Sequence, residues 1–172
     1  MVIRLARPDE YEDVRAFYHS LIDAIANLPY GAGWKKDIYP SREFLRDSID
    51  SQELYIAEDG AIIGAMVVNH EYNESYRKFD WPTKADDSEV LLIHALGVHP
   101  SYSGQGVAKK MVRFVTDKAA SEGMKAIRLD VLKGNLPAEK LYAGMGFRYL
   151  HTLNMFYEDT GWTDYELFEY TL

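Results

Sequence analysis

Cysteine is absent from this chain of 172 residues, so disulfide bonds, thiolate metal sites and a covalent intermediate on a cysteine nucleophile are all excluded. Long apolar runs are missing too, since no stretch approaches the roughly 18 residues that a membrane-spanning helix needs. The first five residues lead into the acidic segment 9–13 instead of the apolar core of a secretory signal. These absences predict a cytoplasmic protein that makes no membrane contact.

Positive charge is also in deficit, because 19 Lys and Arg face 27 Asp and Glu and the formal net charge is −8. Nucleic acids and anionic membranes are recognised first by clustered positive charge, so neither is expected as a partner. A neutral or cationic small partner suits this balance better. The five histidines, at 19, 70, 94, 99 and 151, show no metal-ligand spacing, and we expect no metal site.

With 47% hydrophobic residues and no linker of biased composition, the chain is expected to form one domain over residues 1–172. Apolar residues at three-and-four spacing predict helices, and β-branched or continuous apolar stretches predict strands. The expected helices cover residues 11–25, a segment capped by Ser41, 108–122, and a segment opened by Asn135; the expected strands cover 2–6, 54–57, 62–69, 90–98, 126–132, 147–157 and 164–172. This order describes a mixed α/β sheet whose strand–helix–strand unit lies in the second half.

The stretch 90–98 is apolar except for His94, which predicts a strand buried on both faces at the centre of the sheet. A loop containing Gly104 and Gly106 follows, and then a helix. Such a loop directs backbone N–H groups and the positive end of the helix dipole at one point, and this arrangement predicts a phosphate cradle. The alternative is a tight turn that needs glycine for its geometry alone. The residues of this loop match neither the glycine fingerprint of dinucleotide-binding proteins nor the Gly-Lys-Ser/Thr pattern of kinase-type phosphate loops.

The loop carries a family resemblance. Val98-x-Pro100 followed by Ser103-x-x-Gly106-x-Ala108 resembles the pyrophosphate-binding segment of the GCN5-related N-acetyltransferase (GNAT) family. In the family an arginine or glutamine usually stands where this chain has Ser103, so we expect one side-chain contact to be missing and the backbone donors to remain.

A second motif follows about thirty residues later, with a strand in between. It reads Asn135-x-x-Ala138-x-x-Leu141-Tyr142-x-x-x-Gly146-Phe147 and resembles the second cofactor motif of the same family. The segment 90–98 is also similar to the corresponding strand of the arylalkylamine N-acetyltransferases, where a histidine at the place of His94 belongs to a proton relay. The other histidine of that relay is Leu92 here, which puts a full relay in doubt.

The resemblance implies a GNAT-type fold: a mixed, mostly antiparallel central sheet of six to seven strands, flanked by about four helices, with a splay between the fourth and fifth strands. It also implies acetyl-CoA as co-substrate, without a metal, and direct transfer of the acetyl group to a primary amine of a small molecule or a peptide. The alternative is a non-catalytic acyl-CoA-binding or sensor domain of the same fold. Monomer and homodimer both remain open.

The same resemblance assigns the cofactor site, whose expected residues are Leu96, Gly97, Val98, Ser103, Gly104, Gln105, Gly106, Val107, Ala108, Asn135, Ala138 and Tyr142. Backbone N–H groups of the strand 90–98 would bind the pantetheine arm and polarise the thioester carbonyl. Asn135 would contact that arm or cap its own helix.

Tyr142 matches the family tyrosine that protonates the leaving sulfur; the alternative is that it is only a core residue.

His94 is the first candidate for the base, because imidazole titrates near neutral pH and a polar residue inside an apolar strand calls for a functional or structural explanation. The alternative is that His94 is a buried residue whose imidazole is hydrogen-bonded to a backbone carbonyl. Glu89 is the second candidate for the base. Asp130 is expected to be an exposed strand-edge carboxylate, with steering of a histidine or the substrate as the alternative.

Aromatic residues recur in three segments that grip the substrate in this family, 30–40, 72–81 and 155–162. Trp34, Tyr39 and Trp81 are the candidates for substrate binding, because aromatic rings enclose the apolar body or the cation of an amine. The alternative is that each ring anchors its loop to the core.

Overall fold

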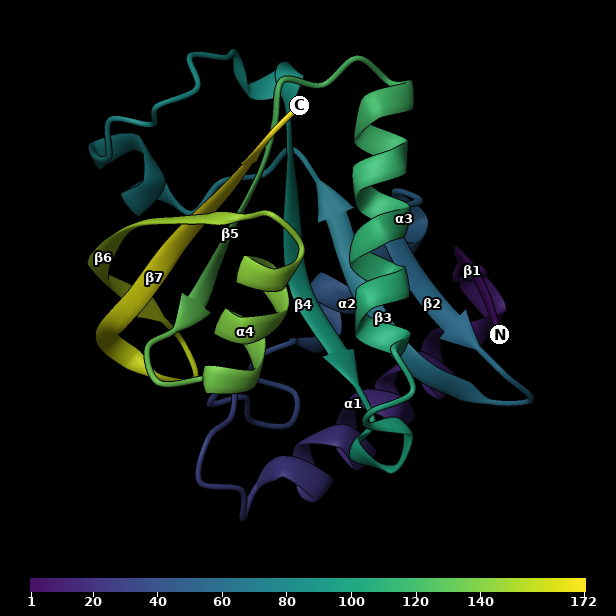
Figure 1. Cartoon of the computed structure of the whole chain (residues 1–172). Helices are drawn as coiled ribbons and strands as arrows, with labels where there is room; N and C mark the ends of the chain where they lie inside the picture. The colour runs from purple at the N-terminus through teal and green to yellow at the C-terminus, as the bar shows by residue number, and fades with distance from the viewer.

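The computed structural model describes residues 1–172, and its seven strands form a single sheet (Figure 1). The strands are β1 (Val2–Leu5), β2 (Leu54–Glu58), β3 (Ile62–Asn69), β4 (Val90–Val98), β5 (Ala126–Leu132), β6 (Arg148–Tyr157) and β7 (Gly161–Thr171); the α-helices are α1 (Tyr11–Ile25), α2 (Arg42–Asp50), α3 (Val107–Ser121) and α4 (Leu136–Gly144). Short 3₁₀ turns occupy Pro8–Glu10, Glu74–Lys78, Asp87–Glu89 and Pro100–Tyr102. The predicted numbers of strands and helices are confirmed.

The strand order is β1-β2-β3-β4-β5-β7-β6, and every neighbouring pair is antiparallel except β4 and β5. Helices cover both faces, because successive side chains of a strand point to opposite sides. On β2, Tyr55 and Ala57 pack with α3 and α4, while Leu54 and Ile56 pack with α1 and α2. Figure 1 shows α3 and α4 in front of the sheet and α1 and α2 behind it. No helix has the length and apolar character needed to cross a membrane.

β4 is the central strand, as its continuous apolar sequence predicts. Residues 90–93 are buried, and the exposure along the rest of the strand alternates. Its parallel pairing with β5 is short: it joins Val90 to Ala126, Leu91 to Ile127 and Leu92 to Arg128, and then ends although both strands continue. The predicted splay between the fourth and fifth strands is therefore confirmed.

A bulge in β4 lies where this splay begins. The register with β3 shifts between Ala65 and Val67, and Ala95 adopts a left-handed conformation with φ of 50°. Bulges bend a strand and increase its local twist. The Tyr18 hydroxyl donates a hydrogen bond of 2.8 Å to the Ala95 carbonyl oxygen. This bond from α1 gives the carbonyl of the bulge a buried partner and fixes the bent strand against the helix layer.

Gly97 provides a test of how closely α1 and the following loop pack on β4. A β-carbon at this position would lie 2.4 Å from Leu21 Cδ2 and 3.1 Å from Trp34 Cζ3, so Gly97→Ala is expected to lower the free energy of unfolding by roughly 1–3 kcal/mol through overpacking. Chemical denaturation measures this change. Gly31→Ala is the matched control, because no atom lies within 4 Å of its added methyl group. Equal denaturation midpoints for the two variants would contradict the packing.

Candidate active site

A cleft of about 630 Å³ opens where β4 and β5 separate. If their pairing continued beyond Leu92 and Arg128, His94 would lie opposite Asp130; instead, both residues line the cleft. The full lining comes from the loop after α1, both splayed strands, the start of α4 and the β6–β7 hairpin: Ala32, Trp34, Tyr39, Ile93, His94, Ala95, Leu96, Asp130, Val131, Leu132, Asn135, Ala138, Tyr142, Tyr157, Asp159 and Tyr165. A mostly apolar lining of this kind is typical of small-molecule sites.

His94 is held by a side-chain network on the β3 side of the cleft. The Asn69 amide nitrogen donates to a Glu53 carboxylate oxygen at 3.1 Å, which leaves the amide oxygen to accept from His94 Nε2 at 2.9 Å. This network assigns the proton to Nε2 and the lone pair to Nδ1. Burial lowers the pKa of His94 to about 4, with a partial offset from the Glu71 backbone. At neutral pH the imidazole is therefore uncharged and able to accept a proton.

Tyr142 comes from α4, where its ring packs edge-on against Phe147 with centroids 5.4 Å apart. The residue is 6% exposed, yet it lines the cleft. Burial, and then the negative charge of Asp130, raise the pKa of Tyr142. The phenol is thus a fully protonated donor at neutral pH. Tyr142 therefore packs in the core and also lines the cleft, so its position is compatible with both roles expected for it.

Glu89 lies at the opposite end of β4 from the cleft. It forms a 2.9 Å ion pair with Lys125, and this hydrogen-bonded lysine lowers the pKa of the Glu89 carboxyl group. Five residue steps along extended chain separate Glu89 from His94 and span about 17 Å. The structure therefore does not bring Glu89 to the cleft, and among the two candidates for the base only His94 reaches it.

The glycine loop leads into α3, and the first backbone N–H groups of this helix have no hydrogen-bond partner in the chain. Gly104 and Gly106 have φ of 77° and 74°, and a β-carbon on either glycine would meet no protein atom within 4 Å. No side chain caps α3, and its first backbone bond runs from Lys110 N to Gly106 O. The N–H groups at the start of α3 are thus available to an anion in the open space before the loop.

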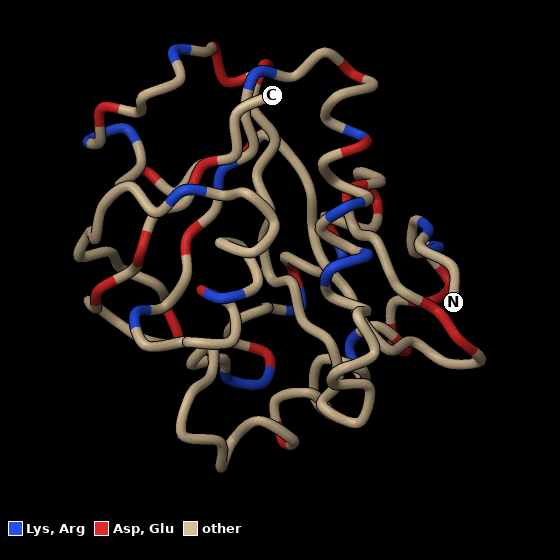
Figure 2. Tube along the Cα trace, viewed as in Figure 1, with Lys and Arg blue, Asp and Glu red and all other residues tan.

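Charge at the start of α3 favours the same kind of ligand. Lys109, Lys110 and Arg113 lie in its first two turns, and its first turn has no acidic residue (Figure 2). Ser103 and Gln105 are exposed on the loop, Val107 is buried beneath it, and Ala108 lies in the first turn. Together these features fit a pyrophosphate group.

Leu96, Gly97 and Val98 lie on the unpaired part of β4. On one side they pair with β3, through Gly97 with Ala65 and Val98 with Gly64. The edge toward β5 has no partner strand beyond Leu92, so its backbone groups are open to a bound molecule. Leu96 itself lines the cleft.

Asn135 precedes the first residue of α4 and lines the cleft together with Ala138. Its side chain makes no capping hydrogen bond, so the expectation that it caps its helix is wrong. Glu139 supplies a local contact instead, because its carboxylate accepts from the Gly134 N–H at 3.1 Å. The Asn135 side chain is therefore free for a ligand in the cleft.

The three aromatic candidates separate into two groups. Trp34 and Tyr39 line the cleft, and Tyr39 also packs against Phe44 and Tyr157. Trp81 does not reach it: its indole nitrogen donates to the Tyr76 carbonyl oxygen, and Arg128 lies 4.4 Å above its ring. Trp81 is 7% exposed and therefore anchors its loop to the core, which is the alternative role expected for it.

Asp130 is not an exposed strand-edge carboxylate, and this expectation is wrong. Its Oδ2 accepts hydrogen bonds from the Tyr76 hydroxyl at 2.6 Å and the Tyr157 hydroxyl at 2.8 Å. Burial raises the pKa of this carboxyl group despite both bonds. The splay of β5 exposes Asp130 to the cleft while the aromatic loops cover it from solvent.

Sequence reasoning missed Asp159 and Tyr165 as residues of the cleft. Asp159 stands next to Thr160 and Gly161, a pattern that indicates a turn and nothing more. Tyr165 is one of several aromatic residues in a terminal strand. The sequence signal is the mixture of aromatic and acidic residues in 155–165, which overlaps the segment 155–162 expected to grip the substrate, and the structure shows that the β6–β7 hairpin brings Asp159 and Tyr165 to the cleft.

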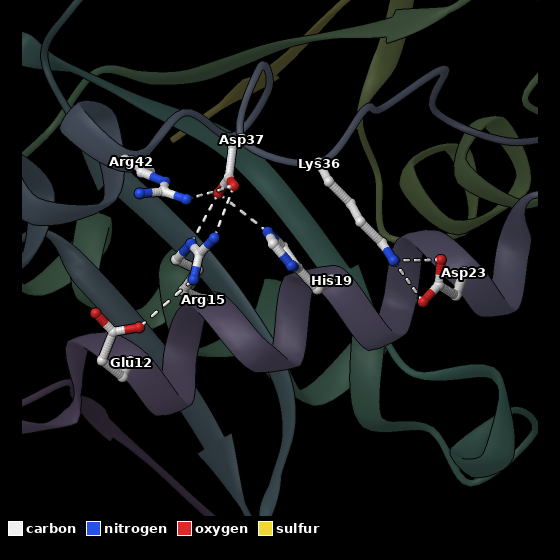
Figure 3. Close-up of polar contacts among 7 residues, drawn as sticks. All are labelled: Glu12, Arg15, His19, Asp23, Lys36, Asp37 and Arg42. Carbon is white, nitrogen blue, oxygen red and sulfur yellow. Dashed lines mark hydrogen bonds and ion pairs between the residues drawn. The ribbon is translucent and has the colours of Figure 1, made fainter.

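An ion cluster fastens the loop 30–40 that carries Trp34 and Tyr39 (Figure 3). Asp37 accepts two hydrogen bonds from Arg15 at 2.8 and 2.7 Å, one from His19 at 3.0 Å and one from Arg42 at 3.2 Å. The bonded Arg15 guanidinium, ahead of the Arg42 and His19 side chains, holds the pKa of Asp37 far below its usual range. The loop is therefore tied to α1 and α2 by a carboxylate that stays charged at any physiological pH.

Comparison with known proteins agrees with this geometry. The family described as "Acetyltransferase (GNAT) family" matches residues 17–147. N-alpha-acetyltransferase 30 of Saccharomyces cerevisiae is 30% identical over 156 residues, covering 87% of this chain and 78% of its own length. Aminoglycoside N(6')-acetyltransferase type 1 of Salmonella typhimurium is 24% identical over 123 residues, covering 70% and 85%.

Solved structures agree as well. An acetyltransferase of the GNAT family from Streptococcus agalactiae superposes with a TM-score of 0.82 at 19% identity, covering 99% of this chain and 95% of that chain. A chain of the NatC complex bound to Gag peptide and CoA gives a TM-score of 0.65 at 26% identity, covering 99% and 98%.

The chain belongs to the GNAT acetyltransferase family and is an acyltransferase. Among its structural neighbours is one that binds CoA.

Asp37→Asn tests the anchor of the loop. Asparagine tolerates the left-handed φ of 59° at this position but loses the charge that pairs with Arg15 and Arg42, so we expect the loop to open more often. The measurement is the rate of limited tryptic cleavage after Lys35 and Lys36, which should rise several-fold. Asp23→Asn is the control, because it removes only the exposed ion pair with Lys36. Equal cleavage rates in both variants would contradict the anchoring role.

Proposed function

We propose that the protein transfers an acetyl group from acetyl-CoA directly to the nitrogen of a primary amine that binds in the cleft between β4 and β5. The observation that carries this proposal is the pairing, across one cleft, of a neutral imidazole at His94 with a protonated phenol at Tyr142. A base and an acid in one cleft suit a reaction in which an amine loses a proton and a thiolate gains one. The absence of cysteine supports direct transfer.

Acetyl-CoA, when bound, supplies the acetyl thioester. The donors at the start of α3 and in the loop 103–108 would hold its pyrophosphate, with Ser103 contributing less than the arginine or glutamine of relatives. The open edge of β4 from Leu96 to Val98, with Asn135 and Ala138 across the cleft, would hold the pantetheine arm. Backbone N–H groups on that edge are suited to polarise a carbonyl, because they are fixed before any ligand arrives.

Tyr142 and His94 move the protons in this proposal. The Tyr142 hydroxyl donates to the departing sulfur, and its raised pKa keeps the proton in place until that charge develops. His94 accepts the proton of the amine at Nδ1, directly or through one water molecule. Asn69 holds Nε2 and keeps the ring in the tautomer that this step needs.

The relatives support an amine acceptor, since two of them are named as N-acetyltransferases. The first test is an assay of thiol release from acetyl-CoA over a panel of small amines and peptides. We expect release that depends on the acceptor. CoA binding without release for any acceptor would overturn the proposal and favour the acyl-CoA sensor.

Tyr142→Phe tests the acid. The phenylalanine ring fills the same space but lacks the proton, so we expect turnover to fall by an order of magnitude or more while the Kd for acetyl-CoA stays nearly unchanged. Steady-state kinetics and calorimetry measure the two quantities. Tyr149→Phe, at an exposed tyrosine on β6, is the control. Unchanged turnover in Tyr142→Phe would remove the role assigned to this residue.

The base is tested by the pH dependence of kcat at saturating amine. Because the pKa of His94 is lowered to about 4, the imidazole is protonated and inactive only below that pH, and the acidic limb should lie near pH 4 instead of pH 6.5. His94→Ala should lose this limb and lower kcat at pH 7 by about a hundredfold. The exposed His151→Ala is the control. An acidic limb identical to that of the parent would exclude His94 as the base.

A further inference from the structure

Two carboxylates lie at the end of the cleft bounded by β5 and the β6–β7 hairpin, and neither is used by the proposed chemistry. Asp130 is held by two tyrosine hydroxyls, which both bond to its Oδ2. Asp159 is 5% exposed, and its Oδ1 has no hydrogen-bond partner although it is buried. An unpartnered buried carboxylate oxygen is rare in folded proteins and costs free energy. Its presence in a cleft indicates a partner that comes from outside the chain.

The cleft offers these carboxylates no positive charge of its own. No lysine or arginine lines it, and no ion pair in the structure includes Asp130 or Asp159. His94 is the single basic side chain in the lining, and it is uncharged at neutral pH. Lys35, which is exposed and does not line the cleft, lowers the pKa of Asp159, and this is the smallest of the contributions to the shift. Within the cleft itself, a bound ligand is thus the available source of a positive charge.

Aromatic rings form the walls around the same end of the cleft. Trp34, Tyr39, Tyr157 and Tyr165 all line it. Tyr157 and Tyr165 pack edge to face with centroids 4.9 Å apart, and Tyr165 shares a hydrogen bond of 2.7 Å with Thr160. Rings fixed in this way bind an ammonium group through their π faces at little entropic cost.

Basic and acidic side chains lie in different places, and each place suits a ligand group of opposite charge. The lysines and arginine at the start of α3 suit an anion, whereas the hairpin end of the cleft carries only carboxylates. His94 and Tyr142, which line the same cleft, would act on the amine that reacts. Asp159 lines this cleft as well, so a ligand with one amine at His94 and Tyr142 can direct a second cationic group toward Asp159.

We propose that the acceptor is a short diamine, and that Asp159 and Asp130 bind its distal ammonium inside the aromatic walls formed by Trp34, Tyr39, Tyr157 and Tyr165. This inference rests on the proposed function. The distal group is recognised by charge and by cation–π contact, while the other nitrogen accepts the acetyl group and releases its proton toward His94.

The experiment compares diaminobutane with pentylamine, which has the same length but a methyl group in place of the distal ammonium. In the parent protein we expect kcat/KM for diaminobutane to exceed that for pentylamine by at least about tenfold. Asp159→Asn keeps the shape of the side chain and removes its charge. This variant should bring the ratio close to one by lowering kcat/KM for diaminobutane, with the value for pentylamine within about twofold of the parent.

Asp164→Asn is the matched control, since Asp164 is a half-exposed carboxylate on β7 of the same hairpin. It should leave the ratio unchanged. A ratio near one in the parent, or a ratio that survives in Asp159→Asn, would overturn the inference.

A measurement on the parent protein covers the case in which Asp159→Asn does not fold. Tetramethylammonium cannot be acetylated but fits an anionic aromatic site, so it should inhibit acetylation competitively with diaminobutane, and the neutral tert-butanol should not. Equal inhibition by both, or none by either, would overturn the inference. Acetylation of pentylamine or a peptide as efficiently as diaminobutane would overturn this inference alone, whereas no thiol release with any acceptor would overturn the proposed function itself.

Discussion

β4 and β5 pair through three residue pairs and then separate, and the site depends on this separation. The bulge at Ala95, fixed by the Tyr18 hydroxyl, turns β4 away from its neighbour. Two parallel strands that continued their ladder would satisfy each other's backbone groups and close the space between them. Because the ladder ends, one edge of β4 keeps free donors and acceptors, and His94 and Asp130 face a cleft instead of each other.

The electrostatic environment at the start of α3 differs from that of the cleft. At the start of α3, uncapped N–H groups and basic side chains suit an anion, and the net charge of −8 makes such a local arrangement necessary for any polyanionic ligand. In the cleft, burial acts on single groups. It lowers the pKa of His94, raises that of Tyr142 and raises those of Asp130 and Asp159. The same desolvation therefore yields an uncharged imidazole, a protonated phenol and two carboxyl groups whose charged form is disfavoured by burial.

The loop 30–40 shows how a segment without regular structure becomes part of a site. Asp37 binds cationic side chains of α1 and α2, so the loop is fixed by charge, while Trp34 and Tyr39 pack between Tyr18, Phe44 and Tyr157. The polar anchor and the aromatic packing lie on different faces of the loop. Its aromatic face can thus form a wall of the cleft without losing its support.

The sequence by itself determined the elements and the motifs, because these depend on local patterns. Apolar periodicity sets α1 and α3, the continuous apolar run sets β4, and the two motifs, at 98–108 and 135–147, indicate the family. Local patterns also placed His94 and Tyr142 on elements that meet at the cleft.

Only the tertiary structure decided which polar and aromatic residues share the cleft. Glu89 and His94 belong to one strand, but the strand's length and the Lys125 ion pair keep Glu89 away. Trp81 and Tyr39 are both loop aromatics, yet one packs on Arg128 and the other reaches the cleft. Asp130 and Asp159 look like an edge carboxylate and a turn residue until the splayed β5 and the closing hairpin bury them together. Burial and charge environment arise from contacts between distant segments, which a linear pattern does not contain.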